Sequence, residues 1–232
     1  MSASSSTKPF DFDAQYGKGY DSMIRAVFPG YESFFQSAAG ILSLSVPKDG
    51  RVLVSGCGTG SELLAFSKLH PQWLLTGVDP SATMIELCRH RLGNHPGLHL
   101  HEGYLDSLDT GSLFDGATSV LVMHFLKDDG SKLAYLKQMR KLLKPDAGYI
   151  HLDVMEWPET KTWQALLQGW EKTALSVGLE KERFDSLVAQ IRQALFGVSE
   201  ARMEELFTQA GFVDIQKFWM CFHHTGWMMR AG

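Results

Sequence analysis

A glycine-rich turn that follows an apolar run is the feature that most constrains the fold of this 232-residue chain. Residues 52–60 read Val-Leu-Val-Ser-Gly-Cys-Gly-Thr-Gly, and a helix-compatible stretch follows at 62–68. The next apolar run ends in Asp79, at about the 20-residue separation typical of nucleotide-binding α/β units. Glycines let a ligand lie against the main chain, and an acid at a strand end accepts ribose hydroxyls. We therefore expect an adenosine-like ligand.

The spacing of the glycines separates two classes of adenosine ligand. A dinucleotide fingerprint reads Gly-x-Gly-x-x-Gly, whereas this chain has Gly56-x-Gly58-x-Gly60. An NAD-dependent dehydrogenase is therefore the weaker interpretation. The Gly-Cys-Gly-Thr-Gly turn and the acid at Asp79 resemble the class I S-adenosylmethionine (SAM) methyltransferases. A strand-like run at 116–123 and a helix end at Leu142-Leu143-Lys144-Pro145 strengthen this resemblance.

Alternation of strand-like and helix-like segments predicts the fold class. We expect a Rossmann-like, doubly wound α/β sheet of seven strands, mostly parallel with an antiparallel last strand. The predicted strands are residues 51–55, 73–79, 98–102, 116–123, 148–154, 213–222 and 227–230. The predicted helices are residues 21–28, 31–44, 62–68, 82–92, 131–143, 157–178 and 179–196, and one that Ser199 caps and that ends at Gly211. Residues 223–226 are expected to join the last two strands as a hairpin.

Length and composition favour one domain over residues 1–232, since 44% of the residues are hydrophobic. We expect a disordered tail at 1–9, an N-terminal helical cap at 10–46, and a helical lid inserted at 155–198, before the sixth strand. The net charge is −4 with both signs interspersed, so nucleic acid is not expected as a partner.

The cysteines and the apolar runs indicate in which cellular compartment the protein is expected. Cys57, Cys88 and Cys221 are odd in number and lack metal-like spacing, which favours a reducing compartment without disulfides. No apolar run reaches the length of a membrane span. We expect a cytoplasmic protein that acts on a small-molecule acceptor, and the sequence leaves a homodimer open.

A nearer resemblance covers most of the chain. Val27-Phe28-Pro29-Gly30-Tyr31, the residues Met84 to Arg89, Ala210-Gly211-Phe212 and Phe218 to Phe222 are similar to the carboxy-SAM synthases of tRNA wobble-uridine modification and to related small-molecule methyltransferases. The resemblance implies cofactor contacts at Tyr31, Gly56, Cys57, Gly58, Asp79, Pro80, Tyr104 and Leu105. Thr59, Gly60, Met84, Asp106 and Met123 complete the expected cofactor site.

Three positions depart from these families. The arginine that marks the synthases falls at Val188, and an apolar side chain cannot pair with an additional carboxylate. Plain SAM is therefore the expected cofactor, with S-adenosyl-L-homocysteine as the product. Val54 stands where most relatives carry an acid, so another group must satisfy the ammonium of SAM. Tyr104 stands where an acid would bind the adenine amino group, which leaves Asp106 or Tyr104 for that role.

His124, just after the fourth predicted strand, is the candidate general base for a hydroxyl acceptor. It lies at the sheet edge where doubly wound proteins bind ligands, although a packed histidine that contributes only shape is the alternative. Tyr16, Tyr20 and Trp157 are the candidate acceptor contacts, with core packing as the alternative. His223-His224 lacks a third metal ligand, so no metal is expected and a solvated turn is predicted there.

These features predict a SAM-dependent methyltransferase that transfers a methyl group to oxygen or nitrogen of a small acceptor by in-line displacement. Alignment of the nucleophile and exclusion of water supply most of such catalysis, up to roughly 7 to 11 kcal/mol. The alternatives are a carboxy-SAM synthase-like enzyme and a catalytically silent SAM-binding subunit of a partner protein.

Overall fold

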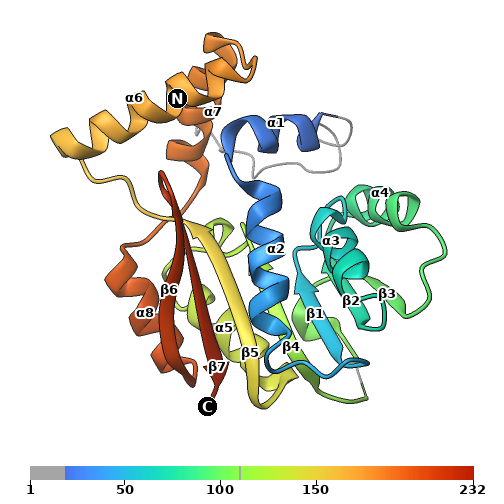
Figure 1. The fold of residues 1–232 in the computed structure, drawn as a ribbon. Coiled ribbons are helices and arrows are strands. Elements are labelled where there is room, and N and C mark those ends of the chain that lie inside the picture. Colours follow the sequence, from blue (N-terminus) through green and yellow to red (C-terminus); the bar gives the residue numbers. More distant parts are fainter. Residues whose placement is uncertain (1–18, 110) are drawn as a thin grey trace, which may run out of the picture.

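A computed structural model describes residues 19–109 and 111–232, which form an α/β fold around a seven-stranded sheet (Figure 1). The strand order is β3-β2-β1-β4-β5-β7-β6. Strand β7 runs antiparallel to β5 and β6, and the other neighbouring pairs are parallel, which confirms the predicted sheet. The strands are β1 Arg51–Ser55, β2 Leu74–Asp79, β3 Leu98–Glu102, β4 Phe114–Val120, β5 Leu143–Val154, β6 Phe212–Cys221 and β7 His224–Ala231.

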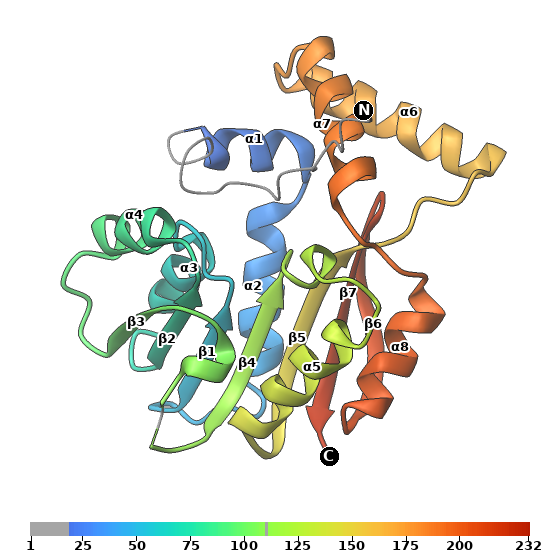
Figure 2. The same ribbon diagram turned by 180° about the vertical axis from the view of Figure 1, so that it is seen from behind.

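Helices cover both faces of the sheet, and each face has its own apolar core. On one face lie α2 Tyr31–Leu42, α3 Ser61–Leu69 and α4 Ala82–Leu92. On the other lie α5 Ser131–Leu142 and α8 Glu200–Gln209, as the reverse view shows (Figure 2). Two short 3-10 turns, η1 Leu105–Ser107 and η2 Met123–Phe125, follow β3 and β4.

Three further helices lie beyond the carboxyl ends of the parallel strands (Figures 1 and 2). They are α1 Tyr20–Val27, α6 Lys161–Ser176 and α7 Lys181–Ala194. The Trp170 indole of α6 donates a hydrogen bond to the Val27 carbonyl of α1 (2.6 Å), which joins these elements. No helix in the two described ranges is long and apolar enough to cross a lipid bilayer.

Side-chain caps and one glycine fix where several helices begin. The Ser199 hydroxyl accepts a hydrogen bond from the Arg202 main chain, which confirms the predicted cap of α8. The Thr160 hydroxyl caps α6 in the same way, and this helix begins at Lys161 instead of residue 157. Gly30, in a left-handed conformation at φ 86°, separates α1 from α2 at the predicted Pro29-Gly30 break.

The fourth strand ends earlier than the sequence predicts. Strand β4 ends at Val120, and Leu121 takes the left-handed conformation at φ 59° before η2 begins. The prediction that the strand reaches Met123 is therefore wrong. The sharp bend at Leu121 turns the main chain away from the sheet direction and brings Val122, His124 and Phe125 to the edge of a pocket.

The hairpin between β6 and β7 also differs from the prediction. Its turn is Phe222-His223 alone, and His224 already pairs with Val154 of β5. The predicted solvated turn is wrong, because His223 and His224 are only 3% and 4% exposed. Helices α1 and α6 cover this end of the sheet: the His223 ring centroid lies 4.3 Å from that of Trp170, and the His224 centroid 4.5 Å from that of Phe28.

These two buried histidines should make the fold sensitive to acid. Burial lowers the pKa of His224 from 6.5 to about 4, and it holds the pKa of His223 well below the usual range. Between about pH 6.5 and pH 4 the unfolded chain binds a proton at His224 that the folded chain excludes. The free energy of unfolding therefore decreases as the pH falls through this range.

We expect His224→Gln to remove about 1.4 kcal/mol per pH unit of this dependence between about pH 6.5 and 4, measured by urea unfolding at a series of pH values. The substitution His99→Gln, at an exposed position of β3, is the matched control. An unchanged slope in His224→Gln would contradict this prediction.

Candidate functional site

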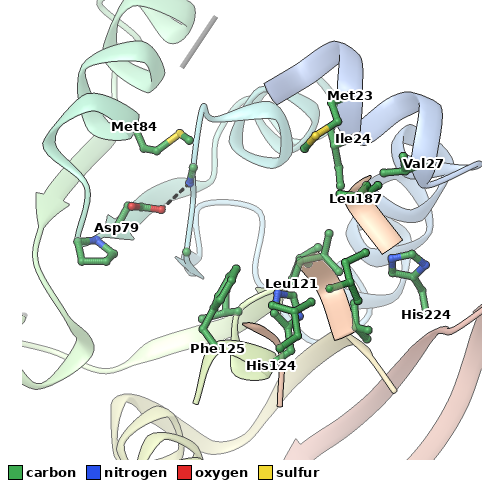
Figure 3. A pocket seen from close by; sticks show the side chains of 18 of the residues that line it. Met23, Ile24, Val27, Asp79, Met84, Leu121, His124, Phe125, Leu187 and His224 are labelled. Atoms are coloured by element: carbon green, nitrogen blue, oxygen red, sulfur yellow. Dashed lines mark hydrogen bonds between the residues drawn. The ribbon is translucent and has the colours of Figure 1, made fainter. Parts of the chain in front are cut away.

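The glycine-rich turn after β1 is held in place by the end of β2. The main-chain N–H groups of Gly56 and Cys57 donate hydrogen bonds to the Val78 carbonyl at 2.7 and 3.0 Å. The Gly58 N–H donates to Asp79 Oδ2 at 2.9 Å (Figure 3). The Ser81 N–H donates to Asp79 Oδ1, also at 2.9 Å. The Asp79 carboxylate therefore braces the turn, a role that the sequence prediction of a ribose contact did not include.

The three glycines of the turn have different physical reasons for lacking a side chain. A Cβ on Gly56 would lie 2.2 Å from Val122 Cγ2, and one on Gly60 would lie 2.6 Å from Cys88 Sγ of α4. A Cβ on Gly58 would meet nothing within 4 Å, and this residue lines a pocket at φ 49°. Gly56 and Gly58 thus expose main chain to the pocket, whereas Gly60 allows α4 to pack closely.

The pocket has a volume of about 200 Å³ and lies between the turn and helices α1, α6 and α7. Most of its walls are apolar, and no lysine or arginine is among the described residues that line it. Asp79, His124 and His224 contribute its titratable side chains, and burial keeps His224 neutral at pH 7. The apolar lining side chains include Met23, Ile24, Val27, Met84, Leu121, Phe125, Trp170, Leu187, Ile191 and Leu195.

The carboxylate of Asp79 and the imidazole of His124 lie on two different sides of the pocket, as Figure 3 shows. Asp79 and Met84 lie on one side, next to the glycine turn. His124 and Phe125 lie across the pocket from Asp79, with Leu121 beside them. A ligand that spans the pocket would have its polar contacts at its two ends and apolar contacts along its length.

His124 is paired with a buried carboxylate. Its Nδ1 contacts Asp153 Oδ1, and Asp153, at the end of β5, is fully buried. Burial opposes ionisation of Asp153, but the charge and hydrogen bond of His124, together with His151, outweigh it and hold the pKa of Asp153 below its usual range. An ionised Asp153 makes His124 Nδ1 the donor, so Nε2 is the nitrogen with the free lone pair.

The structure brings part of the predicted cofactor set to the pocket. Gly56, Gly58, Asp79, Pro80 and Met84 line it, as does His124. Tyr31, Cys57 and Thr59 line a smaller adjoining cavity instead. The Thr59 hydroxyl donates to Asp21 Oδ1 of α1 (2.7 Å), which ties the turn to this helix.

Other predicted contacts lie away from the pocket. Met123 is fully buried in the core of the α5 and α8 face. Leu105 lies in the same core, while Tyr104 is 69% exposed and Asp106 is exposed beside it. Leu105 and Asp106 belong to η1 and Met123 begins η2, the two 3-10 turns that follow β3 and β4.

The predicted acceptor contacts are placed as follows. Trp157 packs against Trp163, Trp170 and His223 and does not line the pocket, whereas Trp170 does. Tyr16 lies outside the described residues, and for Tyr20 the structure describes only its place at the start of α1. No cluster of three potential metal ligands occurs among the described side chains.

Sequence reasoning missed Asp153 and Glu62. Asp153 is a polar residue at the end of a buried strand, which is a signal that could have paired it with His124. Glu62 lies in the first turn of α3 and is 5% exposed, although an acid at this place in a helix is ordinarily solvated.

Comparisons with known proteins identify the family of this chain. A family model described as a methyltransferase domain matches residues 52–146. The carboxy-S-adenosyl-L-methionine synthase of Campylobacter concisus is 31% identical over 215 residues, which cover 90% of this chain and 89% of that protein. The synthase of Campylobacter fetus subsp. fetus is 27% identical over 216 residues, with the same 90% and 89% covered.

Among solved structures, a SAM-bound amino pentose methyltransferase of Micromonospora echinaspora, involved in calicheamicin biosynthesis, shares the fold at a TM-score of 0.63. It is 17% identical, with 92% of this chain and 96% of that chain covered. The family model, the relatives and the fold lead to one conclusion: the chain belongs to the class I SAM-dependent methyltransferases.

Proposed function

We propose that this enzyme transfers the methyl group of SAM to an oxygen or nitrogen atom of a small, apolar or aromatic acceptor. The observation that carries this proposal is a single apolar pocket that joins the exposed main chain of Gly56 and Gly58 to the His124 side chain. Small ligands bind in such concave apolar sites with a few polar groups, and here the site lies at the carboxyl edge of the parallel strands.

The residues present fit the cofactor. Asp79 lies at the end of β2, 2.9 Å from the Gly58 N–H, and its carboxylate has the acceptor capacity to take ribose hydroxyls as well. Pro80 and Met84 supply apolar surface beside it. When bound, SAM supplies an electrophilic methyl group on a sulfonium centre.

His124 is proposed to accept a proton from an acceptor hydroxyl. Asp153 orients the ring through Nδ1, which directs the basic Nε2 to the reaction, and general bases of this kind contribute roughly 10²- to 10⁴-fold in rate. The ring is 4% exposed and borders the pocket, so an acceptor bound there would shield the proton transfer from water.

Helices α1, α6 and α7 are proposed to cover the acceptor. Met23, Ile24, Trp170 and Leu187 from these helices line the pocket, and the aligned displacement needs water excluded. Of the predicted cap at 10–46, only α1 is proposed to cover the site, since α2 packs on the sheet, and residues 1–18 lie outside the described residues. Residues 155–198 are proposed as a lid on one domain, and this lid supplies the apolar surface that selects the acceptor.

The second candidate function is carboxy-SAM formation, which the names of the two Campylobacter relatives favour. Against it, a carboxylate on the transferred group calls for a cation, and the described pocket lining holds no lysine or arginine. Val188, at the position of the arginine that the family resemblance implies, packs with the core of the α2 and α3 face.

Asp79→Asn should weaken binding of S-adenosyl-L-homocysteine at least about tenfold, because charge-assisted hydrogen bonds from the ribose and from Gly58 are lost. Isothermal titration calorimetry measures this. Asp49→Asn, on the exposed loop before β1, is the control. Equal affinity of the wild type and Asp79→Asn would count against the proposed nucleoside site.

His124→Gln should lower the rate of S-adenosyl-L-homocysteine release with an oxygen acceptor by roughly 10²- to 10⁴-fold, since Gln keeps polarity but lacks a base. A panel of phenols and alcohols, offered with SAM to the wild type, supplies the acceptor for the assay. Affinity for S-adenosyl-L-homocysteine should change little. An unchanged rate in this variant would remove the proposed base.

Mass spectrometry of the ligand released from purified protein separates the two candidate functions. We expect SAM or S-adenosyl-L-homocysteine, because the described residues that line the pocket include no lysine or arginine for a further carboxylate. Recovery of a cofactor with a carboxylated methyl group would instead support the synthase activity.

A further inference from the structure

Glu62 is a buried acid beside the glycine turn whose charge the fold does not satisfy. It is the second residue of α3, and its side chain points inward instead of into solvent, with 5% exposure. Its Oε1 is buried and has no hydrogen-bond partner among the described residues. A buried carboxylate oxygen without a partner costs free energy, so its retention needs an explanation.

The side chain borders a small cavity that adjoins the large pocket. This cavity has a volume of about 30 Å³ and is lined by Tyr31, Phe35, Glu62 and the glycine turn. Gly56, Gly58, Val120 and Leu121 line both spaces. The volume admits one group of the size of a water molecule or an ammonium.

The position of the cavity in the sheet indicates which part of a ligand reaches it. Strand β1 has β2 on one side and β4 on the other. Asp79 ends β2, whereas Val120 and Leu121, which line the cavity, lie at the end of β4. A ligand whose ribose is at Asp79 and that crosses Gly58 would have its other end at Glu62.

We propose that the Glu62 carboxylate binds the α-ammonium group of the methionyl part of SAM. This inference rests on the proposed function. Of the two acids among the described residues that line the two adjoining spaces, Asp79 already accepts from Gly58 and Ser81, which leaves Glu62 as the counter-charge. The ammonium would fill the cavity and supply the missing partner of Oε1.

The protonation of Glu62 should change when a ligand ammonium binds, and this change can be measured. Burial raises the pKa of Glu62 to about 7, and the nearby Thr118 hydroxyl acts in the opposite direction. At neutral pH the free protein therefore holds this proton part of the time. An ammonium beside the carboxyl favours its ionised form, so ligand binding should release a proton from Glu62.

Calorimetry with two ligands tests the contact. S-adenosyl-L-homocysteine carries the ammonium, and 5′-methylthioadenosine has the same nucleoside without the amino acid part. Glu62→Gln should weaken binding of S-adenosyl-L-homocysteine at least about tenfold and leave that of 5′-methylthioadenosine within about twofold. Glu86→Gln, an exposed acid on α4, is the matched control and should bind both ligands as the wild type does.

A proton count gives a second readout. Titrations at pH 7 in two buffers of different ionisation enthalpy should show proton release on S-adenosyl-L-homocysteine binding to the wild type, and less release in Glu62→Gln. Loss of affinity for both ligands alike, or for neither, would overturn the role of Glu62. If the wild type binds neither ligand, the proposed function itself fails, which is a distinct result.

The fold of the variant can be checked independently. Because the pKa of Glu62 in the folded protein lies above the unfolded value of 4.5, the folded state loses stability as the pH rises through about 7. Glu62→Gln carries no such charge, so it should unfold at a higher midpoint temperature than the wild type at pH 8.

Discussion

The site depends on the carboxylate of Asp79, which holds two loops at once. Through the Gly58 N–H it fixes the turn after β1, and through the Ser81 N–H it fixes the chain that leaves β2. Ser81 in turn caps α4 by accepting a hydrogen bond from the Met84 main chain at 3.1 Å. One side chain thereby sets the distance between the exposed main chain at Gly58 and the apolar surface of Met84, the two surfaces proposed to hold the nucleoside.

The charge of the described pocket residues is the second feature that bears on the proposed function. The pocket is lined by apolar side chains from α1, α6 and α7, and its two histidines differ in environment. His224 is neutral because it is buried, whereas His124 faces an ionised Asp153. No lysine or arginine is among the described residues that line the pocket, which supports the proposed neutral acceptor and the proposed proton transfer at His124.

Local signals in the sequence were sufficient for the sheet and for the glycine turn. The apolar run at Val52 to Val54 and the glycines after it predicted β1 and its turn with correct bounds, because both depend on short-range conformational preferences. Ser199 predicted the start of α8 for the same reason. Asp79 was correctly placed at the end of β2, but its hydrogen bond to Gly58 spans 21 residues and required the fold.

Tertiary packing determined the placements that local sequence signals did not predict. His223 and His224 resemble a polar turn in sequence, yet the coverage by α1 and α6 buries them. Met123 was predicted at the cofactor, but its side chain is fully buried in the core of the α5 and α8 face. The pairing of His124 with Asp153 joins residues 29 positions apart, so the pairing of β4 with β5 is needed to bring them together.

The most direct test of the central claim is a crystal structure of the protein grown with S-adenosyl-L-homocysteine. It should show the ribose hydroxyls at Asp79, the thioether chain across the main chain of Gly58, and an open space between the sulfur atom and His124. A ligand bound elsewhere, or one whose ribose does not touch Asp79, would contradict the proposed site.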